Sequence, residues 1–426
     1  MAKRAARESD TRVMVFGIGA FAQGAMRCLR EDGAAVSAYL TRDYGHHGPS
    51  LEGTTYDVAE HPDPFRALDR ERPEFVLPMA IEWAFKPWTQ GFLDRRIPIL
   101  CPTGEGLLLE RDRDYARGLC RKYRIPFPTS CRVSTCAEAL RYVRRRPRPY
   151  VLKNPLCSPF SPVHTIVCES AAETRAWLEG GLDDREGLFL QEYLGRAEAG
   201  HIALVSAGEI HSLVTNQEYK RAYAGNLGVV AGAPLGGLVE VDTHDRYGLA
   251  RALLHPLRPW FRKVGFHGPV QVTGIRHGGR WHVLEYNVRL GVTSGMMILR
   301  LLANPVEVLR RTALDQPLQA RFQRGPRWGA LVTLAGYGYP YVRLEGPRLP
   351  VEIRGELDCD VWWNEVAQAK DGRLLMTGHR IAELSALAPS LPGALRRVYA
   401  NLPRIHCLGS YYRLDIGQSL WPPGKT

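Results

Sequence analysis

The fold of this chain is decided by the stretch Trp281-His282-Val283-Leu284-Glu285-Tyr286-Asn287-Val288-Arg289-Leu290-Gly291. Apolar and polar residues alternate along it, as in a β-strand whose side chains point in turn to opposite faces. One face then carries Glu285, Asn287 and Arg289. A preceding strand is predicted over 268–275, and Gly278-Gly279 favours a tight turn between the two. The sequence therefore predicts a β-hairpin with a carboxylate, an amide and a guanidinium in one row.

This row of polar side chains suits a metal ion beside a phosphate. Mg²⁺ (or Mn²⁺) prefers oxygen ligands, and Glu285 and Asn287 offer a carboxylate and an amide oxygen from one rigid element. Arg289, one step further, can hold an anionic group next to that metal. The alternative is a half-buried strand whose polar face only meets water, because such strands show the same alternation. The hairpin flanks favour a candidate metal–nucleotide site.

The composition is ordinary for a globular protein, with 426 residues, 45% hydrophobic and 23% charged. The net charge of +12 could attract anionic small molecules or nucleic acid, although a general bias toward arginine explains most of it. The densest basic run, 144–148, follows a predicted helix that Thr135 and Glu138 open as a capping box. No nucleic-acid motif accompanies this run, so no nucleic-acid partner is expected.

The cysteines and the apolar runs bear on the compartment. Nine cysteines are scattered and never spaced Cys-x-x-Cys, which favours free thiols in a reducing cytoplasm over disulfides or structural zinc. No apolar run approaches the length of a membrane span, and the polar start at residues 1–10 does not resemble a signal peptide. We therefore expect a cytoplasmic protein with no membrane partner, either a monomer or a homodimer.

Strands and helices are predicted to alternate over the first hundred residues, which indicates a doubly wound parallel sheet. The glycine turn Gly17-Ile18-Gly19 before Ala22 could seat a dinucleotide on a helix N-terminus, but no clear ribose-binding acid follows before Asp43. An NAD-dependent oxidoreductase is thus a weaker alternative. The expected strands are 12–16, 36–40, 74–77 and 97–101, and the expected helices follow Gly19 and lie near 65–69 and 83–93.

The rest of the chain divides into further predicted units. Residues 107–123 look helical, and a small α/β unit follows at about 128–190. A helical region near 245–264 leads to the hairpin. Residues 316–327 are a plausible boundary before a strand-rich unit, and the tail at 418–426 is expected to fray.

Several stretches resemble, in the same order, those of the ATP-grasp superfamily, and within it glycinamide ribonucleotide synthetase, also called phosphoribosylamine–glycine ligase. The resemblance implies three domains: a pre-ATP-grasp domain (11–104), a two-lobed ATP-grasp domain (105–318) and a carboxy-terminal strand-rich domain (322–417). The matched stretches are 99–103 with Leu109-Glu110 and Tyr123-Arg124-Ile125-Pro126, Gln191-Glu192-Tyr193-Leu194 with Glu198, Gln217-Glu218-Tyr219-Lys220-Arg221, Leu284 to Gly291, and Tyr412-Arg413-Leu414-Asp415-Ile416-Gly417.

The resemblance implies that ATP phosphorylates a small-molecule carboxylate and that an amine then attacks the acyl phosphate. Glu285 and Asn287 would be the metal ligands, and Arg289 would stabilise the transferring group. Lys220 and Arg221 would neutralise phosphate, unless they are only a solvated basic pair.

The same resemblance assigns the nucleotide-binding residues. Lys153 would contact phosphate, unless it is a snorkelling lysine at a strand end. Arg113 stands where the family has a lysine, and Glu198 would accept from the ribose hydroxyls. The adenine hinge would use mainly backbone groups of Gln191, Glu192 and Leu194.

The chain departs from the family at its loops. The family's glycine-rich phosphate loop is replaced by 153–162, which contains Pro155, Pro159 and Pro162, so the loop is stiffened and loses N–H donors. The acids of the family's "GDPE" are replaced by Val292, Thr293 and Ser294. Three hypotheses follow: a carboxylate–amine ligase of purine biosynthesis or a diverged relative, an ATP-binding pseudoenzyme, and the oxidoreductase. The intact Glu285, Asn287 and Arg289 favour the ligase.

Overall fold

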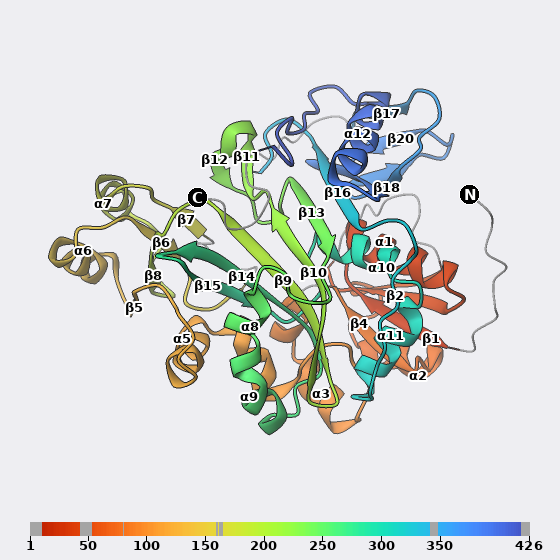
Figure 1. Cartoon of the computed structure of the whole chain (residues 1–426). Helices are drawn as coiled ribbons and strands as arrows, with labels where there is room; N and C mark the ends of the chain where they lie inside the picture. Colours follow the sequence, from red (N-terminus) through yellow and green to blue (C-terminus); the bar gives the residue numbers. More distant parts are fainter. Residues whose placement is uncertain are drawn as a thin grey trace.

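The computed structural model describes residues 11–42, 53–79, 81–158, 161, 165–340 and 348–418. An eight-stranded sheet occupies the centre, with an amino-terminal parallel sheet on one side and a small lobe on the other (Figure 1). Much of the carboxy-terminal part of the chain, residues 350–404, packs at the top of the view. The predictions for the start of the chain, for Asp43, for Pro159 and Pro162 and for the tail after residue 418 lie outside the described residues.

The amino-terminal sheet is wholly parallel, in the order β3-β2-β1-β4. Helix α1 (Gly19–Glu31) packs on one face, while α2 (Pro64–Glu71) and α3 (Trp88–Asp94) pack on the other. The predicted doubly wound sheet is confirmed. Residues 97–101 do not form the predicted strand and contribute only a bridge between Val76 and Ile99. The strands are β1 (Arg12–Phe16), β2 (Ala35–Leu40), β3 (Thr54–Asp57) and β4 (Phe75–Pro78).

Two predicted helices are broken. The one at 83–93 becomes a 3₁₀ turn, η1 (Ile81–Phe85), followed by α3, because Pro87 cannot donate a backbone hydrogen bond. The one at 107–123 becomes η2 (Gly104–Leu107), α4 (Leu108–Arg111) and α5 (Arg113–Lys122). Asp112 is extended between the last two, and its carboxylate accepts from the N–H groups of residues 114 and 115, which caps α5.

The small lobe is an antiparallel sheet of order β5-β8-β6-β7 covered by two helices. Thr135 caps α6 as predicted, accepting from the Glu138 N–H, while the Glu138 carboxylate accepts from Ser134 N. The elements are β5 (Ser130–Val133), α6 (Cys136–Arg145), β6 (Tyr150–Lys153), β7 (Thr165–Val167), α7 (Ala171–Glu179) and β8 (Leu188–Glu192).

The central sheet is antiparallel, in the order β15-β14-β9-β10-β13-β16-β21-β18. It runs across the expected boundary at 316–327, because β16 pairs with β13 and then with β21. Its strands are β9 (Glu198–Ser206), β10 (Glu209–Glu218), β13 (Gly236–Val241), β14 (Gly268–His277), β15 (Arg280–Asn287), β16 (Trp328–Ala335), β18 (Asp360–Trp363) and β21 (Arg380–Ala388).

Helices cover both faces of this sheet. On the face next to the amino-terminal sheet lie α10 (Ser294–Leu301) and α11 (Pro305–Ala313), and on the other lie α8 (Leu249–Leu253) and α9 (Arg258–Lys263), joined by η4 (His255–Leu257). The predicted helical region at 245–264 is thus two short helices. The remaining elements are β11 (Arg221–Tyr223), η3 (Ala224–Asn226), β12 (Leu227–Val230), β17 (Pro350–Ile353), β19 (Val366–Gln368), β20 (Leu374–Met376), α12 (Leu391–Asn401), η5 (Leu402–Arg404) and β22 (Ile405–His406).

The predicted hairpin is present as β14 and β15. Gly278 and Gly279 both have positive φ, which the turn requires and glycine tolerates best. The register shifts between Thr273 and Gly274, so that Thr273 faces Glu285 and Gly274 faces Val283. Leu284 is therefore left out of the pairing, as in a β-bulge, and bulges often lie beside functional sites.

Candidate functional site

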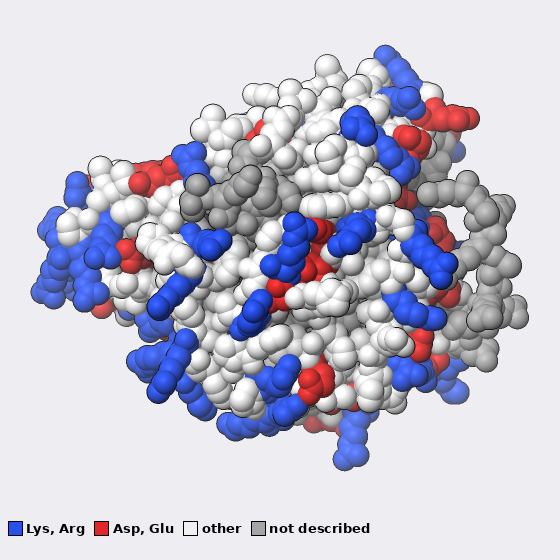
Figure 2. All heavy atoms as spheres, in the orientation of Figure 1, with Lys and Arg blue, Asp and Glu red and all other residues white. Residues whose placement is uncertain are grey.

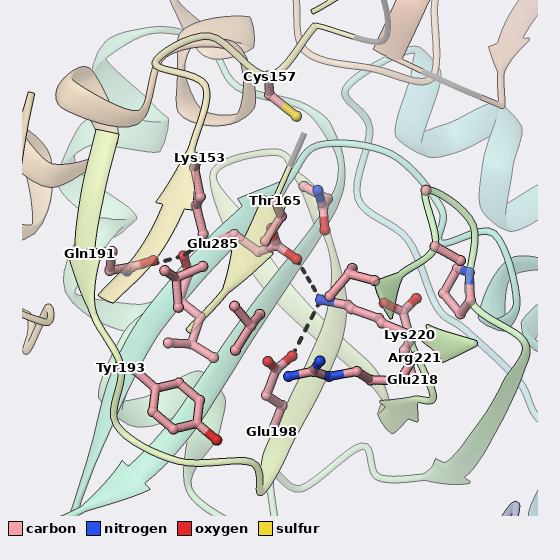
Figure 3. A pocket seen from close by; sticks show the side chains of 18 of the residues that line it. Lys153, Cys157, Thr165, Gln191, Tyr193, Glu198, Glu218, Lys220, Arg221 and Glu285 are labelled. Atoms are coloured by element: carbon pink, nitrogen blue, oxygen red, sulfur yellow. Dashed lines mark hydrogen bonds and ion pairs between the residues drawn. The ribbon is translucent and has the colours of Figure 1, made fainter. Parts of the chain in front are cut away.

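A cavity lies between the small lobe and the central sheet, and Figure 3 shows its interior. Strands β6, β7 and β8 line it from the lobe, and β9, β10 and β15 line it from the sheet. Every residue that the sequence assigned to the site borders this one cavity. These residues are Arg113, Lys153, Gln191, Glu192, Leu194, Glu198, Lys220, Arg221, Glu285, Asn287 and Arg289.

Lys220 joins two acids at the centre of the cavity. Its Nζ lies 2.8 Å from Glu285 Oε1 and 3.3 Å from Glu198 Oε2, as the dashed lines in Figure 3 show. Burial disfavours the ammonium, yet the two acids raise the pKa of Lys220 well above its usual value. Burial would likewise raise the pKa of Glu285, but Lys220 and Lys153 hold it well below its ordinary value. Lys220 is therefore a permanent cation beside an ionised carboxylate.

The bulge at Leu284 connects the sheet to the lobe. The Leu284 carbonyl accepts from Lys153 Nζ at 3.2 Å and from Gln191 Nε2 at 3.4 Å. Lys153 is buried, and burial together with nearby Arg113 lowers the pKa of Lys153 to about 8. A lysine with this pKa gains its charge most easily when an anion comes close.

We expect the affinity for a non-hydrolysable ATP analogue to fall as the pH rises through about 8, because Lys153 loses its proton there. Calorimetric titration between about pH 7 and pH 9 checks this, with proton uptake on binding near pH 8.5. In Lys153→Met the affinity should be low and nearly independent of pH. A wild-type affinity that stays flat across this range would contradict the role of Lys153.

Glu110 contacts the candidate metal ligand Asn287 and its neighbours Val288 and Arg289, although no role was assigned to Glu110 from the sequence. Its buried carboxylate accepts from Asn287 Nδ2 at 3.3 Å and from Val288 N at 2.7 Å, and Arg289 Nε lies 3.3 Å away. Because the Asn287 amide nitrogen is engaged, its oxygen remains for a cation. With the ionised Glu285, this gives two hard oxygen ligands, so the residues fit Mg²⁺.

The predicted adenine hinge lies on β8 and the residues after it. Gln191 is buried and its Oε1 accepts no hydrogen bond among the described residues. The Glu192 carboxylate is engaged by Arg148 at 2.6 Å, and the Glu192 N–H donates to Thr129 O. No hydrogen bond of the described residues uses the Leu194 N–H. Gln191 Oε1 and the Leu194 N–H therefore remain available to a base edge.

The segment that replaces the family's glycine loop is pinned. Arg113 N donates to Pro155 O, Cys157 N donates to Arg111 O, and Leu156 bridges to Asp112. The Arg113 guanidinium also donates to Asn154 O at 2.8 Å. The described part of this segment therefore lies against the start of α5.

Arg221 is already engaged by protein groups. Its guanidinium contacts Glu169 at 3.1 Å and the Gly228 carbonyl at 2.7 Å. The buried Arg413 donates to Arg221 O, stacks over Tyr219 and pairs with Asp415. The carboxy-terminal matched stretch, which contains Arg413 and Asp415, therefore contacts the basic pair Lys220-Arg221 through the backbone of Arg221.

A second group of side chains that could bind a metal ion has a structural role. His201, Asp242 and Asp245 are buried together. The Asp245 carboxylate accepts from the N–H groups of Ala250 and Arg251, which caps α8. Asp242 accepts from Thr215 and from Arg246 N, and burial lowers the pKa of His201. The cluster therefore caps the start of α8.

Basic side chains gather over α6 at the far end of the small lobe (Figure 2). Arg144 and Arg145 form its last turn and are exposed, where they suit the negative end of the helix dipole. This agrees with the predicted solvated helix end. All nine cysteines are free, as predicted, and no described helix is long and apolar enough to cross a lipid bilayer.

The amino-terminal glycine turn is covered by protein. A Cβ on Gly17 would lie 2.9 Å from Met79 Cβ, and one on Gly19 would overlap the Asn364 amide. The Gln23 side chain accepts from Trp363 N at 2.6 Å. The first turn of α1 therefore packs against the carboxy-terminal residues.

We expect NADH to show no saturable fluorescence change with this protein, because a pyrophosphate at α1 would need the space that Met79 and Asn364 occupy. A titration at micromolar NADH checks this. Saturable quenching that Gly19→Ala removes would instead support the oxidoreductase.

Comparisons with known proteins agree with this geometry, although no protein-family model matches the chain. It is 26% identical over 351 residues to a phosphoribosylamine–glycine ligase of Synechocystis, covering 78% of this chain and 81% of the relative. The structure of phosphoribosylamine–glycine ligase from Thermotoga maritima superposes with a TM-score of 0.74 at 23% identity, covering 95% of this chain and all of that one.

A more distant structure carries nucleotide and metal. The biotin carboxylase domain of the 2-oxoglutarate carboxylase from Hydrogenobacter thermophilus, solved with MgADP and bicarbonate, superposes with a TM-score of 0.69 at 15% identity. It covers 94% of this chain and 91% of that one. This chain has the ATP-grasp fold, and in sequence over most of its length it is similar to the phosphoribosylamine–glycine ligases.

Proposed function

We propose that the protein is an ATP-dependent carboxylate–amine ligase of the phosphoribosylamine–glycine ligase type, acting in purine biosynthesis or on a related pair of small molecules. The observation that carries the proposal is the meeting of Lys220, Glu285, Asn287 and Arg289 at one cavity between two lobes. The nine free thiols suit a reducing compartment, so we place it in the cytoplasm.

In this proposal the chain positions charge along a phosphoryl-transfer path. Leu194 and Gln191 receive the adenine, and Glu198 accepts from the ribose. Lys153, Lys220 and Arg113 surround the phosphates with positive charge, which is the main contribution a protein makes to phosphoryl transfer. Arg221 follows Lys220 in the sequence and would add its positive charge to these three residues.

Arg289 serves the second half of the reaction. The γ-phosphoryl group passes to the substrate carboxylate, and an amine displaces phosphate from the resulting acyl phosphate. The Arg289 guanidinium, held by Glu110, stabilises the oxyanion that forms at the acyl carbon. Glu285 and Asn287 would hold Mg²⁺ (or Mn²⁺), which would supply charge neutralisation for the phosphoryl transfer.

The test is ADP release from ATP with glycine and phosphoribosylamine generated in situ, followed by a screen of other carboxylates and amines. We expect ADP release that requires both a carboxylate and an amine. If the protein binds ATP but releases no ADP with any pair, the ligase proposal fails.

The pinned segment after Lys153 favours a second candidate, an ATP-binding pseudoenzyme. Contacts with residues 111–113 fix its described part, in which Asn154, Cys157 and Ser158 border the cavity. In that case ATP would raise the melting temperature but would not be consumed. The ionised Glu285 and the polarised Asn287 favour the ligase, because a pseudoenzyme has no need for an ordered metal site.

A further inference from the structure

Three side-chain oxygens that make no hydrogen bond to any described residue lie close together beside Gly291. A methyl group placed on Gly291 would overlap Ser294 Oγ and would lie 2.8 Å from Gln271 Oε1 and 3.5 Å from Glu218 Oε1. The oxygens come from α10, β14 and β10. Because Gly291 has no side chain, these three oxygens can approach one point, and we call them the polar cradle.

The cradle is buried and its oxygens lack partners. Gln271 and Ser294 are 2% and 1% exposed, and neither oxygen accepts or donates a hydrogen bond among the described residues. No described residue donates to the Glu218 carboxylate either. A buried polar atom without a partner destabilises the protein, so a ligand that donates hydrogen bonds here is favoured.

The cradle lies next to the proposed reaction centre, and Glu218 is its member that borders the cavity. Gln271 pairs with Asn287 across β14 and β15, so both side chains share one face of the sheet. Glu218 borders the cavity together with Arg289 and Val292. A group held by Glu218 would therefore lie beside the residues that handle the acyl phosphate.

We propose that Glu218, Gln271 and Ser294 bind the attacking primary amine, and that Glu218 accepts the proton which this amine loses. This inference rests on the proposed ligase function. The Glu218 and Gln271 oxygens match the two N–H donors of a neutral primary amine, and the Ser294 hydroxyl can accept as well as donate, whereas an anion would be repelled by the Glu218 carboxylate. The cations of Lys220 and Arg289 and the start of α10 disfavour a further positive charge, so the neutral, nucleophilic amine is favoured.

The proposed step is balanced. The amine lone pair forms the new N–C bond, the bond from the acyl carbon to phosphate oxygen breaks, and inorganic phosphate leaves. One amine proton passes to Glu218 and then to solvent. Burial raises the pKa of Glu218, which makes it a stronger base than an exposed carboxylate.

Two variants test the cradle with separate readouts. Gly291→Ala places a methyl group among the three oxygens, and Glu218→Gln keeps the shape but removes the base. Gly118→Ala is the matched control, because its added methyl meets nothing within 4 Å beyond the nearby backbone of its own helix. The first half-reaction is followed by positional isotope exchange in ATP with glycine alone. The complete reaction is followed as kcat/KM for phosphoribosylamine.

We expect both variants to lower kcat/KM for phosphoribosylamine by about tenfold or more while isotope exchange stays within about twofold of the wild type. The wild-type pH profile of this kcat/KM should show one ionisation that Glu218→Gln removes. Unchanged kinetics would overturn the proposal. So would loss of isotope exchange with a raised KM for glycine, which would assign the cradle to the glycine nitrogen.

A binding measurement keeps the cradle testable if the wild type releases no ADP, which is the failure of the proposed function. Crystals with a non-hydrolysable ATP analogue are soaked in hydroxylamine, a small amine that is neutral near physiological pH. We expect its nitrogen between Gln271 and Ser294 in the wild type and not in Gly291→Ala. A water in both, or direct pairing of Gln271 with Ser294, would overturn the amine assignment.

Discussion

Glu285→Ala and Asn287→Ala should each reduce ATP turnover by about a thousandfold, to background, without unfolding the protein. Glu285 is the ionised carboxylate of the site, and Asn287 offers the amide oxygen beside it. Loss of either leaves one ligand where a hard cation needs several. ADP release at saturating Mg²⁺ measures the effect.

The fold should survive these changes. In Glu285→Ala, Lys220 keeps its ion pair with Glu198, so no charge is left alone. The melting temperature should therefore stay near that of Glu209→Ala, a matched control at an exposed pair with Arg262 on the start of β10. Excess Mg²⁺ should restore part of the activity of Glu285→Gln. Wild-type turnover in both alanine variants would remove the metal assignment.

The sequence predicted the hairpin well because its signals are local. Alternation with period two placed Glu285 and Asn287 on one face, and two consecutive glycines predicted the turn. The bulge at Leu284 was beyond such signals. It is stabilised by Lys153 and Gln191, which lie 131 and 93 residues away along the chain, and only the folded chain brings them together.

Helix boundaries show the same limit. Residues 107–123 have the composition of one helix, but the Asp112 carboxylate caps α5 and so divides the segment. An aspartate in a helical run can be either an interior residue or a cap, and tertiary contacts decide which. The bridge of Leu156 to Asp112 is one such contact.

The candidate site was assembled by order of motifs rather than by geometry. The eleven residues that the resemblance assigned to the site all border one cavity, and their individual roles remain predictions. It assigned no role to Glu218, although Glu218 lies in a matched stretch, or to Gln271, and it marked Ser294 only as a departure from the family. Their importance appears only when unpaired oxygens from three elements face one another.

Glu110 gives the second large effect that we expect. Glu110→Ala should lower the free energy of unfolding by about 2–4 kcal/mol, because it removes the acceptor of Val288 N and Asn287 Nδ2 and the partner of Arg289. Denaturant unfolding measures this. Turnover should fall by about a hundredfold as well, since Asn287 and Arg289 lose their orientation.

A positioning role and a purely structural role of Glu110 differ in one measurement. If Glu110 orients Asn287, the folded Glu110→Ala protein should need about tenfold more Mg²⁺ for half-maximal turnover. The Asn287 amide could then rotate and would present its oxygen to the metal for only part of the time. Glu110→Gln keeps an oxygen for Val288 N but loses the charge beside Arg289. In this variant kcat should fall by a larger factor than the Mg²⁺ requirement rises. An unchanged Mg²⁺ requirement in Glu110→Ala, together with a lower stability, would mean that Glu110 only holds α4 to β15.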